Sequence, residues 1–203
     1  QGLFITYDPN ATGINPAGAA AHAYHDGSEM GTPGWYNVNT FALSGSTLIN
    51  PDNHSTIRNM SLSPISIVVT GTVPSADMSL NIVSRSAGEQ DNLVYNPFPA
   101  GITLANSNLY ESGAVSPTPS LFAPSGGDFV FVYAQDTTVF DPSAADAYVY
   151  DASFDMGAPG WYNVNTFQLA NDVVIGAGQA ITIRKAQGSD SNISWNASKP
   201  YTL

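Results

Sequence analysis

The sequence predicts an all-β protein built from two tandem copies of one β-sandwich-like module of the Greek-key or jelly-roll type, joined by a connector that contains strands. Three observations predict this fold. Short stretches of alternating apolar and polar residues recur along the chain and are bounded by turn residues. The composition favours strands and turns, with 10 Tyr, 9 Phe, 18 Gly and 14 Pro among 203 residues. One block of sequence also occurs twice, which indicates a duplicated unit.

The duplication is seen most clearly in Met30–Phe41, which recurs as Met156–Phe167 at an offset of 126 residues. The similarity extends without gaps from Leu3–Pro74 to Phe129–Pro200. The segment between the two copies is not a third repeat. We therefore predict a first β module over 1–74, a connector with short strands and a Pro- and Ser-rich end over 75–128, and a second β module over 129–203.

Five strands are expected in each copy, because each apolar alternating stretch ends at turn residues. The first copy is predicted to hold strands at Leu3–Tyr7, Ala20–His25, Trp35–Phe41, Ser55–Arg58 and Ile65–Val73. The second copy is predicted to hold strands at Phe129–Ala134, Ala145–Asp151, Trp161–Phe167, Ala180–Lys185 and Ser191–Trp195. Shorter strands are expected in the connector at Leu80–Ser84, Leu93–Tyr95 and Ile102–Leu104.

The composition of the chain argues against several classes of protein. There are 16 acidic and 5 basic residues, and the net charge is −11. A nucleic-acid-binding surface needs clustered Lys and Arg, so nucleic acid is not an expected partner. No apolar run reaches the ~20 residues of a membrane-spanning helix, so membrane insertion is not expected. The absence of Cys removes thiol catalysis and thiolate zinc sites.

Three stretches carry a resemblance to a known group of proteins: Asn10–Pro16, Gly34-Trp35-Tyr36 and Gly176–Lys185. The chain resembles an uncharacterised family of secreted bacterial β-repeat proteins with paired Gly-Trp-Tyr … Ala-Gly-x-x-x-x-Ile-Arg-Lys modules. The first copy departs from this pattern at Asn50–His54, which replaces a Gly-rich turn. The resemblance implies export to the cell surface or exterior and a β fold. It implies no activity.

Asn-x-Ser/Thr sequences occur five times, and they have two explanations. Either the composition, rich in Asn, Ser and Thr, produces them by chance, or they mark a glycosylated exterior surface. The candidates are Asn10, Asn53, Asn59, Asn192 and Asn196.

Two sets of polar side chains are candidates for metal ligation. His22 and His25 have a zinc-like spacing, but on a strand residues three apart point to opposite faces, which is the wrong geometry for one metal. Glu29 and Asp155 occupy equivalent positions in the two copies, and Asp151 lies close by in sequence. We expect these carboxylates to stabilise turns, with a structural calcium site as the alternative. No other cofactor is predicted.

The repeated Gly-Trp-Tyr-Asn-x-Asn block holds the candidate interaction residues. Trp35 and Trp161 are expected to anchor the cores, because Trp is highly buried on average. The alternative is that they are exposed platforms for sugar stacking. The Asn residues would either pair across an interface between modules or subunits, or form a turn network within one module. The candidates are Trp35, Tyr36, Asn37, Asn39, Trp161, Tyr162, Asn163 and Asn165.

No motif of nucleophilic, phosphate-binding or paired-carboxylate catalysis is found, so an enzyme is not predicted. Lys normally protects edge strands from pairing with other chains, and it is scarce here. The sequence therefore predicts an extracellular structural protein that self-assembles as a filament, surface layer or matrix subunit. The expected route is strand addition from Gln1–Tyr7 or Ser194–Leu203. The alternative is a secreted carbohydrate-binding or adhesion module with glycans as partners.

Overall fold

The computed structural model describes residues 2–8, 11–49, 55–61, 63, 72–134 and 146–202. These residues form β-strands joined by turns, without a helix, which confirms the all-β prediction. Within the same ranges, no helix has the length and apolar character needed to cross a membrane. The chain divides into two compact units. Unit 1 is Gln1–Ala11 with Asn15–Gly71, and unit 2 is Thr12–Ile14 with Thr72–Leu203.

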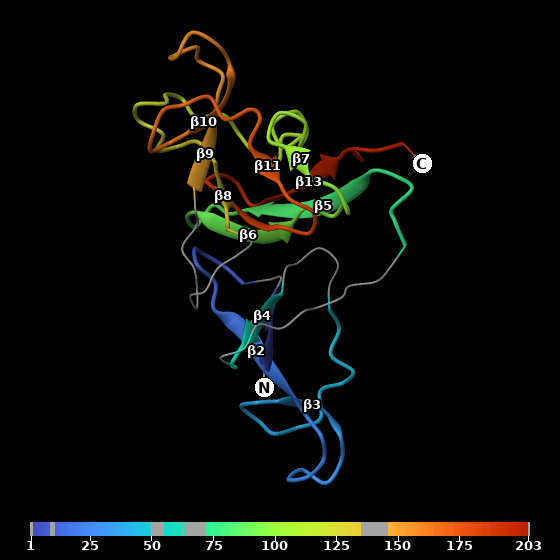
Figure 1. The fold of residues 1–203 in the computed structure, drawn as a ribbon. Coiled ribbons are helices and arrows are strands. Elements are labelled where there is room, and N and C mark those ends of the chain that lie inside the picture. Colours follow the sequence, from blue (N-terminus) through green and yellow to red (C-terminus); the bar gives the residue numbers. More distant parts are fainter. Residues whose placement is uncertain are drawn as a thin grey trace. The chain divides into compact units, whose positions relative to one another are not determined.

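Unit 1 holds one antiparallel sheet with the strand order β3-β2-β1-β4 (Figure 1). The strands are β1 (Gly2–Tyr7), β2 (Gly18–His25), β3 (Gly34–Asn37) and β4 (Thr56–Asn59). Three consecutive strands pair in turn, and the fourth returns to lie beside the first. This arrangement is a Greek key, as the strand pattern predicts.

Unit 2 holds a five-stranded sheet with the order β10-β9-β8-β12-β6 and two smaller two-stranded sheets, β13-β5 and β11-β7. The large sheet repeats the Greek key of unit 1 and adds β6 beyond β12. Its strands are β6 (Gln90–Tyr95), β8 (Phe129–Val132), β9 (Asp146–Asp151), β10 (Gly160–Asn163) and β12 (Ala180–Lys185). The small sheets use β5 (Met78–Ser84), β13 (Ser191–Ala197), β7 (Ile102–Thr103) and β11 (Val174–Ile175).

The core of unit 2 forms where these layers pack together. Ile82 of β5, Trp195 of β13 and Ile183 of β12 are all 0% exposed and belong to one apolar cluster. Trp195 is also hydrogen-bonded, because its Nε1 donates to the carbonyl of Ser107 at 2.7 Å. Burial of these side chains supplies the main driving force for folding of the unit.

The two Greek keys have the same register at the 126-residue offset. Phe4 pairs with His22 in unit 1, and Val130 pairs with Tyr148 in unit 2. The remaining pairs correspond in the same way: Phe4 with Ile57 to Val130 with Ile183, and Tyr24 with Trp35 to Tyr150 with Trp161. Side-chain contacts are repeated too, since the hydroxyl of Tyr7 lies 3.1 Å from that of Thr56 and the hydroxyl of Tyr133 lies 3.0 Å from that of Thr182.

The segment 75–128 differs from the predicted connector, because it lies within unit 2 and builds its core. Its strands β5 and β6 pair with β13 and β12. About half of the described core cluster comes from this segment, including Leu80, Val94 and Leu104. A segment of short strands with polar turns looks like a connector in sequence, whereas its apolar positions become core once distant strands cover them.

Two predicted strands end earlier than expected. The stretches Trp35–Phe41 and Trp161–Phe167 leave the strand after Asn37 and Asn163. Both then turn through a Phe with positive φ, 56° at Phe41 and 57° at Phe167. The prediction that these strands continue beyond Asn37 and Asn163 is therefore wrong. Most of the predicted strand Ile65–Val73 lies outside the described residues, and so does Ala145.

Candidate interaction surface

One face of the unit 1 sheet is apolar and exposed. Directly paired residues of antiparallel strands point to the same face, as do residues two apart on one strand. Phe4, His22, Tyr24, Trp35 and Ile57 therefore share a face, because they are joined by such pairs. We call these five residues the open face. Tyr24 is 59% exposed, Ile57 48% and Trp35 42%.

The equivalent face of unit 2 is buried. Trp161 is 1% exposed and Ile183 is 0% exposed, at the positions of Trp35 and Ile57. The two aromatic pairs have nearly the same geometry. Tyr24 and Trp35 meet edge to face with ring centroids 5.8 Å apart, and Tyr150 and Trp161 do so at 5.5 Å. The difference in burial therefore arises from what covers the face, since the sheets themselves agree.

The cover in unit 2 comes largely from the loop that follows β7. Tyr110 stacks on Tyr150 with ring centroids 3.7 Å apart, and Leu104 and Leu109 belong to the same core cluster as Trp161. Burial among these groups raises the pKa of the Tyr150 hydroxyl above its usual value. This loop belongs to the segment 75–128, which occurs once in the sequence and lies within unit 2.

A pocket of about 250 Å³ lies on the open face beside Trp35. Its lining corresponds to core positions of unit 2, because Ser44 is equivalent to Ala170 and Ile49 to Ile175, both of which are buried there. The pocket of unit 1 therefore lies at the position that a second layer covers in unit 2. It is lined by Phe4, His22, Trp35, Ser44, Gly45, Thr47 and Ile49.

His22 contributes the polar group of this pocket. It is 5% exposed, and its Nδ1 lies 2.8 Å from the hydroxyl of Ser44. Its Nε2 is buried and has no hydrogen-bond partner among the described residues. A buried polar atom without a partner costs about 1–3 kcal/mol, so a group that approaches this face and hydrogen-bonds Nε2 would be favoured. The sequence pattern indicated His22 only as a possible zinc ligand, because its place in a pocket depends on residues distant in sequence.

Trp161 does not present a sugar-stacking surface, because it is buried in the core as the favoured interpretation predicted. Trp35 is exposed, and so the core prediction is wrong for this residue. Tyr36 and Tyr162 are buried and donate their hydroxyls to the carbonyls of Thr32 and Ala158, at 2.8 and 2.9 Å.

The Asn residues form a turn network within each unit. The Oδ1 of Asn37 accepts from the backbone N–H groups of Asn39 and Thr40, at 2.9 and 3.1 Å. Asn163 holds the equivalent turn through the N–H of Asn165 at 2.9 Å, and its Nδ2 donates to Asp146 Oδ1 at 2.7 Å. These bonds hold the backbone where the strand ends.

The acidic residues also act in turns. Asp155 Oδ2 accepts from the Ser120 hydroxyl and from the Leu121 N–H, both at 2.8 Å, and these bonds lower the pKa of the Asp155 carboxyl. Asp151 is buried and accepts from the Ser153 N–H at 2.8 Å. Glu29 belongs to unit 1 and lies 3.6 Å from Nε2 of His25. Across the ranges that the structure describes, no three His, Asp or Glu side chains gather as metal ligands.

The sequons differ in accessibility. Asn192 and Asn196 are exposed on β13. The side chain of Asn59 is engaged, because Nδ2 donates to the Ser63 carbonyl at 2.8 Å and Oδ1 accepts from the Ser61 N–H at 3.0 Å. Asn10 and Asn53 lie outside the described residues.

The first and last strands, β1 and β13, are both paired within the protein itself. β1 is an inner strand that pairs with both β2 and β4, so Gly2–Tyr7 is fully used within its own sheet. β13 pairs with β5 along its length, and Lys199 and Tyr201 bond to the backbone and side chain of residues 74–77. Strand addition by these ends would require the protein to give up its own pairing. This pairing argues against strand addition by either segment as the route of assembly.

No protein-family model, curated protein or solved structure matches this chain.

Proposed function

We propose that this protein is an extracellular structural protein that assembles with copies of itself, and that the open face of unit 1 is the contact. The observation that carries the proposal is the difference between two sheets with one register. Unit 2 buries this face against a second layer, whereas unit 1 exposes Tyr24, Trp35 and Ile57. Exposed apolar patches of this kind typically mark interaction sites.

The free energy of apolar burial favours the binding of a partner to the open face. Full burial of one large apolar side chain is worth about 1.5–3 kcal/mol, so covering the exposed parts of Tyr24, Trp35 and Ile57 contributes a few kcal/mol. A partner for Nε2 of His22 would add to this. The gain must exceed the loss of translational and rotational freedom on association, which favours a contact that covers the whole face.

Charge favours a second copy as the occupant. Each chain carries a net charge of −11, so two copies repel each other in general. The open face holds no acidic or basic side chain apart from His22, and repulsion is weakest when such faces meet. In unit 2 the residues of the equivalent surface share one apolar cluster with the loop that follows β7 and with residues of β5 and β13, so this face suits packing against a second apolar layer. We therefore place two open faces against each other about a two-fold axis.

A two-fold contact gives pairs, and an extended assembly needs a second contact. Unit 2 exposes an independent apolar patch around Phe122 and Phe167, whose ring centroids lie 5.8 Å apart. Phe122 is 67% exposed and nearby Phe154 in the same unit is 60% exposed. Contacts through this patch would join pairs into a filament, layer or matrix. The exposed sequons on β13 are consistent with a glycosylated exterior.

The test uses the absence of Cys. Tyr24→Cys places one thiol on the open face of the full-length chain, and Val174→Cys places one at a 54% exposed position of unit 2. The alkylation rate at position 24 is expected to fall at least several-fold as protein concentration rises, while the rate at position 174 stays constant. A rate at position 24 that does not change with concentration would refute the open-face contact.

Carbohydrate binding through Trp35 is the second candidate, favoured by the pocket beside its ring. Exposed Trp rings stack on sugars, and Ser44 and Thr47 supply hydroxyls. In this case oligosaccharides would change the fluorescence of the wild-type protein but not of Trp35→Phe, and they would do so at concentrations where the chain is monomeric.

A further inference from the structure

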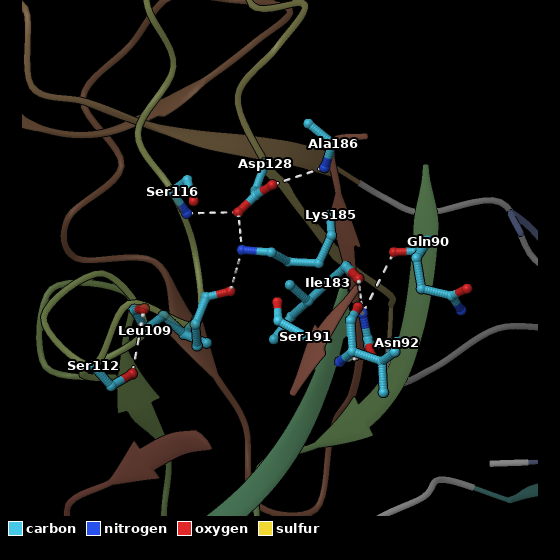
Figure 2. Close-up of polar contacts among 12 residues, drawn as sticks. Gln90, Asn92, Leu109, Ser112, Ser116, Asp128, Ile183, Lys185, Ala186 and Ser191 are labelled. Atoms are coloured by element: carbon cyan, nitrogen blue, oxygen red, sulfur yellow. Dashed lines mark hydrogen bonds and ion pairs between the residues drawn. The ribbon is translucent and has the colours of Figure 1, made fainter. Parts of the chain in front are cut away.

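A lysine and an aspartate are buried together in the core of unit 2. Lys185, the last residue of β12, is 3% exposed, and Asp128, just before β8, is 2% exposed. The Lys185 Nζ contacts Asp128 Oδ2 (Figure 2). It also donates to the carbonyl of Ala114 at 3.0 Å. The proposed assembly does not use this pair.

Backbone groups hold the Asp128 carboxylate in place. Oδ2 accepts from the Ser116 N–H at 2.6 Å, and Oδ1 accepts from the Ala186 N–H at 2.8 Å (Figure 2). Each carboxylate oxygen therefore has its own donor, and the carboxyl group cannot turn away from the amine. Because a carboxyl carbon lies about 1.2 Å from its oxygens, Nζ is within reach of Cγ as well.

We propose that Lys185 and Asp128 join through an intramolecular amide bond. The ammonium of Lys185 first gives a proton to Oδ2 of Asp128, which leaves a neutral amine and a carboxylic acid. Nζ then attacks Cγ, and the Ala186 N–H stabilises the negative charge that develops on Oδ1. A second proton passes from Nζ to Oδ2, the Cγ–Oδ2 bond breaks, and Oδ2 leaves as water. One N–C bond forms, one molecule of water is lost, and no oxidant or cofactor is required.

The surroundings favour this condensation. Two charges buried in a core carry a large desolvation penalty, whereas an amide is neutral. Fixed neighbours react as if at effective concentrations of about 10⁵–10⁸ M when their geometry is correct. The chain contains no Cys for disulfide bonds. An amide between these residues would close a loop spanning 57 positions and would fasten β12 to the start of β8.

Unit 1 provides an internal comparison. At the 126-residue offset, Gly2 stands in place of Asp128 and Asn59 in place of Lys185. Unit 1 therefore cannot form the bond, and one cross-link is expected per chain.

The experiment is mass spectrometry of the full-length wild-type protein. Its mass is expected to be lower than the sequence mass by one water, and digestion at aromatic residues should give a peptide holding Asp128 joined to one holding Lys185. Lys185→Arg, which retains the charge, and Asp128→Ala should both lack the water deficit. A wild-type protein with the full sequence mass and no joined peptide would overturn the proposal, whether or not the variants fold.

Discussion

Trp35 and Trp161 occupy the same position in two sheets of one register, yet Trp161 is 1% exposed and Trp35 is 42% exposed. The residues around them in sequence are nearly identical. Their different environments therefore arise from the second layer, which unit 2 draws from the segment 75–128.

Substitution of the two Trp residues should have different effects on the free energy of unfolding, because one is buried and the other is exposed. Trp161→Ala removes a fully buried aromatic side chain and is expected to lower the free energy of unfolding of unit 2 by about 3–5 kcal/mol. Trp35→Ala should change the unfolding of unit 1 by less than about 1 kcal/mol at concentrations where the chain is monomeric. Urea denaturation followed by near-UV circular dichroism measures both. Equal losses for the two variants would contradict the assigned burial.

The Asn turn should contribute measurably to stability. Asn163→Ala removes the acceptor for two backbone N–H groups and is expected to cost about 1–2 kcal/mol in the free energy of unfolding. Asn165→Ala is the matched control, because its side chain is exposed, and a change within about 0.5 kcal/mol is expected. The same denaturation experiment applies, and a control as destabilised as Asn163→Ala would show that the turn does not depend on this side chain.

These comparisons show what the sequence can and cannot predict. Alternation of apolar residues located the strands of the four-stranded and the five-stranded sheet, because it depends only on neighbours along the chain. The role of 75–128 was missed, since the pairing of β5 with β13 and of β6 with β12 joins residues far apart in sequence. Exposure of Trp35 could not be predicted for the same reason. The early strand ends required the side-chain bonds of Asn37 and Asn163, which a period-2 pattern does not reveal.

The Asp155 carboxyl should titrate below its usual range. Because the Ser120 hydroxyl and the Leu121 N–H stabilise the charged form, the folded pKa is lowered. The stability that this contact contributes is fully present above the pKa of the unfolded state and is lost as pH falls through the folded pKa. NMR titration of the side-chain carboxyl carbon measures the midpoint. Ser120→Ala should raise that midpoint, and an unchanged midpoint would show that the hydroxyl has no such effect.

Glycan attachment should follow side-chain accessibility. In a host that glycosylates Asn-x-Ser/Thr sites, Asn192 and Asn196 are expected to be modified to a higher occupancy than Asn59, whose amide is hydrogen-bonded. Enzymatic removal of the glycans converts each modified Asn to Asp, and peptide mass spectrometry locates it. Preferential modification of Asn59 would contradict the structure around β4.

Assembly through unit 1 is tested most directly by sedimentation velocity of the full-length chain over a wide range of concentrations. The wild-type protein should form dimers or larger species as concentration rises. The double variant Trp35→Asp, Ile57→Asp places charge on the open face and should remain monomeric, while Val174→Asp should associate like the wild type. A wild-type chain that stays monomeric throughout, or a double variant that associates unchanged, would contradict the account.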